Sequence, residues 1–97
     1  MPTQPPDRGY AATRDQLHQR LRRIEGQVRG VQRMIDEDRW CPDVLLQIAA
    51  VQAALDKVAL GLADDHARHC ILEGPAGARD ERTEELMAAV GRLVRRG

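Results

Sequence analysis

Apolar residues recur along the first third of the chain at alternating steps of four and three positions. They are Leu17, Leu21, Ile24, Val28, Val31 and Ile35. This spacing puts them on one face of an α-helix, whereas in a strand it is alternate residues that share a face. The pattern predicts a helix from about residue 13, capped by Thr13 or Asp15. We expect it to end near Asp36–Asp38, because carboxylates are unfavourable at a helix C-terminus.

A second, longer helix is predicted to begin at Cys41–Pro42, since proline fits the first turn of a helix and Asp43 suits the N-terminal dipole. Its apolar stripe is Val44, Ile48, Val51, Leu55, Val58 and Leu62, widened by Leu45, Ala49, Ala53, Ala59 and Leu60. The pattern reaches about Leu72, and the segment Gly74–Gly77 ends it. A surface this broad needs more than one neighbouring helix.

A third helix is predicted from about Asp80 to Arg95, with Leu86, Val90 and Leu93 facing inward. No segment alternates as a strand does, so we expect an all-α protomer of three helices. Residues 1–12 are rich in proline and polar side chains and are predicted to form a flexible tail, and residues 13–97 a single helical domain. Such a short chain cannot cover its own long helix, so we expect an obligate helical oligomer.

Composition narrows the possible functions. The net charge is zero, yet residues 1–33 hold seven arginines against three carboxylates, and residues 34–70 hold three basic against seven acidic side chains. The basic segment fits an anionic partner, although a solvated helix face is the ordinary alternative. The chain has no serine and no phosphate-binding loop, so we expect no enzyme. No uninterrupted apolar run of about 18 residues exists, so we expect no membrane span.

Two cysteines without an export signal indicate a cytoplasmic protein whose thiols are free or bind metal. His66 and Cys70 are four residues apart and share a helix face. Cys41 lies about 37 Å from His66 along a continuous helix, so one chain cannot bring all three together. If a second copy packs antiparallel, Cys41 of one chain meets His66 and Cys70 of the other.

Two thiolates and one imidazole form a soft three-coordinate set that suits Cu(I). Zinc would need a fourth ligand, from water or from His69. The plain alternative is an incidental His-x-x-x-Cys sequence in which Cys70 is a small buried residue. A Cys–His nucleophile pair is also conceivable, but the sequence shows no third group to orient it.

Four segments together resemble the copper-sensitive operon repressor (CsoR) family. They are Leu21–Gly30 (LRRIEGQVRG), Arg33–Ile35, Trp40–Val51 (WCPDVLLQIAAV) and His66–Cys70 (HARHC). The resemblance covers about residues 14–95. It implies an antiparallel dimer that pairs into a dimer-of-dimers tetramer without a helix-turn-helix. It also implies a repressor that binds double-stranded operator DNA without metal and releases it on binding Cu(I), so that copper efflux or resistance genes are expressed.

The resemblance also separates branches of the family by their ligands. Nickel and cobalt sensors add an N-terminal histidine, where this chain has Arg8, Gly9 and Tyr10. Formaldehyde-responsive members lack the second cysteine, and persulfide sensors lack the histidine. Cys41, His66 and Cys70 therefore match the copper branch. Copper members often place a tyrosine before the first cysteine, linked to a glutamate of the third helix. Here the residue before the first cysteine is Trp40, whose indole only donates hydrogen bonds. The glutamate would be Glu85, or Glu84 if the loop after Cys70, which looks short, shifts the register.

Arg20 and Lys57 match basic positions that the resemblance implicates in operator binding. Arg22, Arg23 and Arg29 are added as DNA contacts from their charge and helix position, with Arg33 evenly balanced between DNA contact and solvated charge. Such residues mostly contact phosphates, so binding should weaken steeply with salt. Two rival functions remain: a thiol or persulfide redox sensor that joins Cys41 to Cys70 of a partner chain, and a purely structural helical module.

Overall fold

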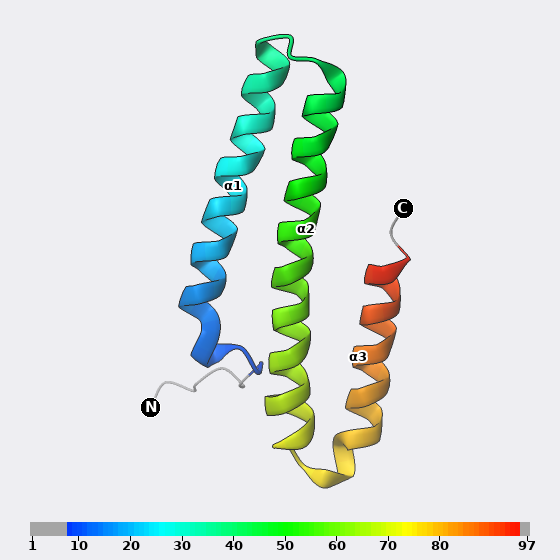
Figure 1. Cartoon of the computed structure of the whole chain (residues 1–97). Helices are drawn as coiled ribbons and strands as arrows, with labels where there is room; N and C mark the ends of the chain where they lie inside the picture. The colour runs from blue at the N-terminus through cyan, green and yellow to red at the C-terminus, as the bar shows by residue number, and fades with distance from the viewer. Residues whose placement is uncertain (1–7, 96–97) are drawn as a thin grey trace. The chain divides into compact units, whose positions relative to one another are not determined.

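The computed structural model describes residues 8–95, which contain helices and turns but no strand (Figure 1). Helix α1 spans Arg14–Asp36, α2 spans Cys41–His66 and α3 spans Arg79–Val94. Three short turns complete the order, namely the 3-10 turn η1 (Ala11–Thr13), the π-helical turn η2 (Ala67–Leu72) and the 3-10 turn η3 (Ala76–Ala78). The predicted three-helix, all-α protomer is confirmed, and each predicted helix start lies within one residue of the observed one.

The described chain divides into two compact units, one of residues 14–60 and one of residues 8–13 together with 61–95. In the first unit, α1 ends in a Schellman-type turn. The N–H of Asp38 donates to the Ile35 carbonyl at 3.1 Å, and the N–H of Arg39 donates to the Met34 carbonyl at 2.9 Å. Asp38 occupies the left-handed position of this motif, with a φ of 53°. Aspartate tolerates this conformation better than most residues, so the turn forms without glycine.

Few side chains of the first unit are buried. Ile24 of α1 and Val58 of α2 are each 7% exposed, whereas most other apolar residues of both helices are open to solvent. Large apolar side chains that remain exposed in this unit include Leu21, Val28, Ile35, Leu45, Leu46, Ile48, Leu55 and Leu60. Exposed apolar area of this extent is typical of a surface that another protein chain covers. The oligomer expected from the sequence remains a prediction.

In the second unit, α3 packs against η2 and η3. Cys70 and Ile71 are its buried side chains. The N-terminal segment joins this unit, because the Thr13 hydroxyl donates to Asp65 Oδ2 at 2.7 Å. Residues 1–7 of the predicted tail lie outside the described residues, and the boundary between tail and helical domain at residue 13 remains a prediction.

The helical stretch Cys41–Leu72 is long and apolar enough to cross a membrane, by length and composition alone. One such helix is weak evidence, because a helix that packs inside a soluble assembly passes the same test. Asp56 and Lys57 stand at its middle, and Asp64, Asp65 and Arg68 follow. A charge at the bilayer centre costs about 2.5–3.5 kcal/mol on insertion scales. The charges thus favour protein, and not lipid, as the neighbour of this helix.

Candidate functional site

His66 and Cys70 lie at the junction where α2 changes from an α-helix to a π-helix. The change is defined by the Glu73 N–H, which donates to the Arg68 carbonyl five residues earlier at 3.1 Å. The sequence predicted an α-helix through Leu72, and the π-helical turn is a departure from that expectation. Its wider turn keeps residues four apart close to one face, and π-helical turns are frequent at functional sites. His66 is half-buried and Cys70 is 9% exposed.

The N-terminal segment lies directly over this pair of candidate ligands. Gly9 is buried and has a φ of 93°, a conformation that side chains rarely adopt. A Cβ atom placed on Gly9 would lie 3.0 Å from Cys70 Sγ and 3.2 Å from the Cα of His66. Thr13 anchors the segment through its hydrogen bond to Asp65. Any other residue at this position would be strained by the positive φ and would crowd the thiol.

Cys41, the third candidate ligand, is exposed at the first residue of α2. Cys41 and His66 are the first and last residues of one continuous helix, α2. The predicted separation of about 37 Å between them assumed such a helix. Within residues 8–95 of one chain, no group of three or more His, Cys, Asp or Glu side chains is arranged to hold a metal ion. The two-chain site predicted for Cys41, His66 and Cys70 remains a prediction.

The predicted partners of the metal ligands lie in open positions in the single chain. Trp40 is 71% exposed. Glu84 and Glu85 are exposed on α3, and no hydrogen bond or ion pair joins either of them to His66 among the described residues. His69, the possible fourth zinc ligand, donates from Nδ1 to Glu73 Oε2 at 2.9 Å. The network that the resemblance implies remains a prediction.

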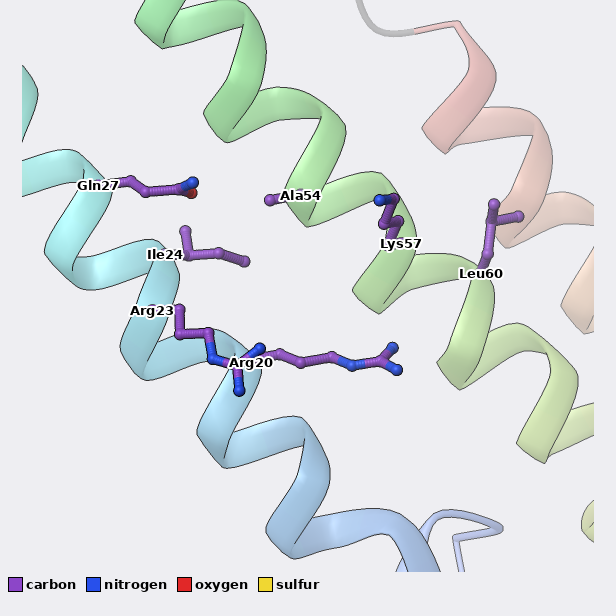
Figure 2. A pocket seen from close by; sticks show the side chains of 7 residues that line it. All are labelled: Arg20, Arg23, Ile24, Gln27, Ala54, Lys57 and Leu60. Atoms are coloured by element: carbon purple, nitrogen blue, oxygen red, sulfur yellow. The ribbon is translucent and has the colours of Figure 1, made fainter.

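Three of the predicted DNA-binding residues line one groove of the first unit. Arg20 and Arg23 come from α1 and Lys57 from α2, and Gln27 joins them (Figure 2). The groove encloses about 550 Å³, its other lining residues are Ile24, Ala54 and Leu60, and no carboxylate lines it. A cationic groove with amide and guanidinium donors is suited to phosphate oxygens. Gln27 was missed from the sequence because an uncharged residue carries no signal in a charge pattern.

The remaining arginines of the predicted set are separated from this groove. Arg22 is exposed and does not line it. Arg29 lies 4.0 Å from Glu25 and borders a second groove, of about 460 Å³, whose other lining residues include the apolar Leu21, Ile24 and Val28. A surface of this composition is better suited to a protein neighbour than to phosphates. Of the three arginines added from charge and helix position, only Arg23 therefore lines the groove that contains Arg20 and Lys57.

Comparisons with known proteins give a consistent picture. A model of the family described as metal-sensitive transcriptional repressors matches residues 13–92. The copper-sensing transcriptional repressor RicR of Mycobacterium tuberculosis is 53% identical over 91 residues, covering 90% of this chain and 94% of that protein. The copper-sensing repressor CsoR of Geobacillus thermodenitrificans, solved with Cu(I), superposes with a TM-score of 0.78 at 37% identity, covering 96% of this chain and 95% of the other. The nickel-responsive regulator InrS superposes with a TM-score of 0.71 at 45% identity, over 81% and 90% of the two chains.

Proposed function

Because the chain belongs to the metal-sensitive transcriptional repressors, which are DNA-directed regulators and not enzymes, we propose that it is a cytoplasmic Cu(I)-responsive repressor. Its metal-free oligomer binds operator DNA, and Cu(I) at a site shared between two chains weakens that binding. The observation that carries the proposal is the set of three soft donors divided between the two ends of one continuous helix, Cys41 at its start and His66 with Cys70 at its end.

The choice of Cu(I) rests on the donors and on the residue that faces them. Two thiolates and one imidazole match the preference of Cu(I) for soft ligands at low coordination number. Nickel favours additional nitrogen or oxygen donors. The position that packs against Cys70 Sγ is Gly9, which has no side chain to coordinate a metal. Relatives named as copper sensors support the same choice, while the similarity to a nickel-responsive regulator makes metal identity the first point to test.

The shared site needs an antiparallel pair of chains. Cys41 of one copy then meets His66 and Cys70 of the other, twice in each dimer. The exposed apolar side chains of α1 and α2 supply area for such a pairing, and two dimers would form the tetramer. When bound, Cu(I) supplies a fixed link between the start of one α2 and the end of the other. The two thiols lose their protons on coordination, so metal affinity depends on pH.

DNA binding is assigned to the groove of Arg20, Arg23 and Lys57, with Arg22 on the neighbouring exposed surface. Each cation would neutralise a phosphate, which gives affinity with little sequence information. If metal binding changes the spacing of these grooves within the oligomer, the operator no longer fits them. By linkage, operator DNA weakens Cu(I) binding by the same factor, typically about 5–150-fold.

The decisive experiment mixes two inactive variants. Cys41→Ser lacks the first donor, and the double variant His66→Ala/Cys70→Ser lacks the other two. Each variant alone should lose tight Cu(I) binding, measured against a competing Cu(I) chelator. A mixed dimer regains one complete site, because Cys41 of one chain faces His66 and Cys70 of the other. Equal mixing should therefore restore Cu(I)-dependent release of a duplex that the metal-free protein has selected from random sequence.

Three results would contradict the proposal or a part of it. If the mixture binds no Cu(I) above the level of the parent variants, the shared site is wrong. Tight Cu(I) binding that leaves DNA affinity unchanged contradicts the repressor mechanism. Release of DNA by Ni(II) and not by Cu(I) assigns the chain to nickel sensing. Metal-free wild-type protein without added Cu(I) is the baseline in each case.

A thiol sensor is the second candidate, because both cysteines are free and Cys41 is exposed. In that function a two-electron oxidant such as hydrogen peroxide converts Cys41 of one chain and Cys70 of another into an intermolecular disulfide, with two protons lost from the thiols and peroxide reduced to water. His66→Ala separates the two candidates. A copper sensor loses its metal response in this variant, whereas a disulfide sensor keeps its response to peroxide.

A further inference from the structure

The carbonyl oxygen of Cys70 lies at the end of a helix that cannot supply it with a donor. In the i to i+5 pattern of η2, its partner would be the N–H of residue 75, and Pro75 has none. Two residues earlier the same pattern is satisfied, since the Arg68 carbonyl accepts from the Glu73 N–H at 3.1 Å. The Cys70 carbonyl is therefore one of the unsatisfied groups of a helix C-terminus.

Arg82 of α3 supplies the missing donor. Its Nη1 donates to the Cys70 carbonyl oxygen at 2.6 Å in a part-buried position, joining residues twelve apart in sequence. The contact is charge-assisted, which makes it stronger than a hydrogen bond between neutral groups. Loss of this donor would leave a part-buried carbonyl oxygen without its protein partner, which costs free energy.

Gly74 keeps open the space in which the two groups meet. A Cβ atom on Gly74 would lie 2.5 Å from the Cys70 carbonyl oxygen and 2.8 Å from Arg82 Nη1. Real Cβ atoms do not approach a backbone oxygen so closely, so any other residue would push the guanidinium or the carbonyl away. Two residues on separate elements thus serve one contact, Arg82 by donating and Gly74 by leaving room.

We infer that Arg82 is a positioning residue that ties α3 to the backbone of the metal ligand Cys70 and so transmits metal binding to α3. The inference rests on the proposed function. If Cys70 shifted on binding a metal ion, its backbone carbonyl would shift as well. The hydrogen bond from Arg82 would then pass that shift to α3. This route runs through the backbone of Cys70 and does not depend on the imidazole of His66 or on a glutamate of α3.

The test compares Arg82→Gln with Arg79→Gln. Arg79 is a matched control, because it also lies on α3 and donates to a carbonyl of η2, that of Leu72, but at 3.2 Å and in an exposed position. For each protein, Cu(I) affinity is measured against a chelator, and the affinity for the selected duplex is measured with and without Cu(I). In Arg82→Gln, the ratio of the DNA affinity without Cu(I) to the DNA affinity with Cu(I) should fall about tenfold. The stoichiometry of one Cu(I) per chain and the DNA affinity of the metal-free protein should stay at the wild-type values. Arg79→Gln should match the wild type.

A second comparison disturbs the contact without changing any charge. Gly74→Ala should reproduce the loss of coupling, whereas Gly77→Ala should not, because a Cβ atom on Gly77 meets nothing within 4 Å. Arg82→Lys, which keeps one cationic donor, should restore part of the coupling. A purely structural role would instead lower metal-free DNA binding and Cu(I) stoichiometry together, and hydrogen exchange of the metal-free variants separates local loosening of residues 70–74 from global unfolding.

The outcomes distinguish this inference from the function beneath it. If wild-type protein does not release DNA on Cu(I) addition, the proposed function is wrong and the inference ends with it. If the wild type responds and both Arg82→Gln and Gly74→Ala respond equally well, the function stands and the role of Arg82 is refuted. If Arg82→Gln does not fold, Gly74→Ala and Arg82→Lys decide the question by the same ratio.

Discussion

The basic groove gives the sharpest quantitative prediction. Lys57→Gln removes one of the three cations that line it and keeps a side chain of similar length that still donates hydrogen bonds. For B-DNA, each neutralised phosphate adds about 0.9 to the slope of log affinity against log salt. Between about 50 and 200 mM salt, one contact therefore accounts for a change of about 3.5-fold in affinity, for every copy that touches the duplex.

Replacing all three cations multiplies this effect. The variant Arg20→Gln/Arg23→Gln/Lys57→Gln should lower the slope by about 2.7 for each contacting copy, which corresponds to about 40-fold over the same salt range. No carboxylate lines the groove, so no acidic neighbour there neutralises these cations in the wild-type protein, and their full charge is lost in the variant. The expected signature is a smaller salt dependence as well as weaker binding.

Fluorescence anisotropy of a labelled duplex, titrated with metal-free protein at several salt concentrations, measures both quantities. Arg39→Gln is the charge-matched control, because Arg39 is exposed, lies 3.9 Å from Glu37 and does not line the groove. Its slope should equal that of the wild type. The reasoning fails if the triple variant keeps the wild-type slope, or if Arg39→Gln lowers it as much as Lys57→Gln does.

Three further predictions concern packing. Gly9→Ala should lower the free energy of unfolding of the metal-free protein by about 1–2 kcal/mol, because alanine must adopt a φ of 93° against Cys70. Gly26→Ala, in a helix with open space around the residue, should instead raise this free energy by up to about 1 kcal/mol. Urea unfolding measures both changes, and equal effects of the two variants contradict the packing argument. Thr13→Val should cost about 1 kcal/mol by removing the 2.7 Å hydrogen bond to Asp65, and thermal unfolding unchanged in the variant would show that this contact is unimportant. Leu46→Lys, at a side chain 69% exposed in one chain, should shift the sedimentation coefficient towards smaller species, and an unchanged oligomer would exclude this face as the interface.

Helix boundaries and candidate ligands were accessible from the sequence because they depend on local chemistry. The 4-3 spacing of apolar residues located α1 and α2, and Pro42 with Asp43 marked the start of α2 at Cys41. The presence of Cys41, His66 and Cys70 in a chain with only two cysteines suggested the candidate donor set, which remains a prediction. The fact that α2 continues to His66 also follows from composition, since no glycine–proline segment occurs before Gly74.

Only the tertiary structure decided which neighbours these local elements have. The apolar spacing did not predict the π-helical turn at Ala67–Leu72. A π-helix differs from an α-helix only in that each hydrogen bond spans five residues and not four, and this difference leaves no signal in the sequence pattern. The approach of Gly9 to Cys70 and the bond from Arg82 to the Cys70 carbonyl join residues far apart in sequence. The meeting of Arg20 and Arg23 with Lys57 in one groove depends on where α2 lies beside α1. Sequence determined the helices and suggested the candidate donors because each depends on a few adjacent residues, while contacts between distant residues depend on how the whole chain packs.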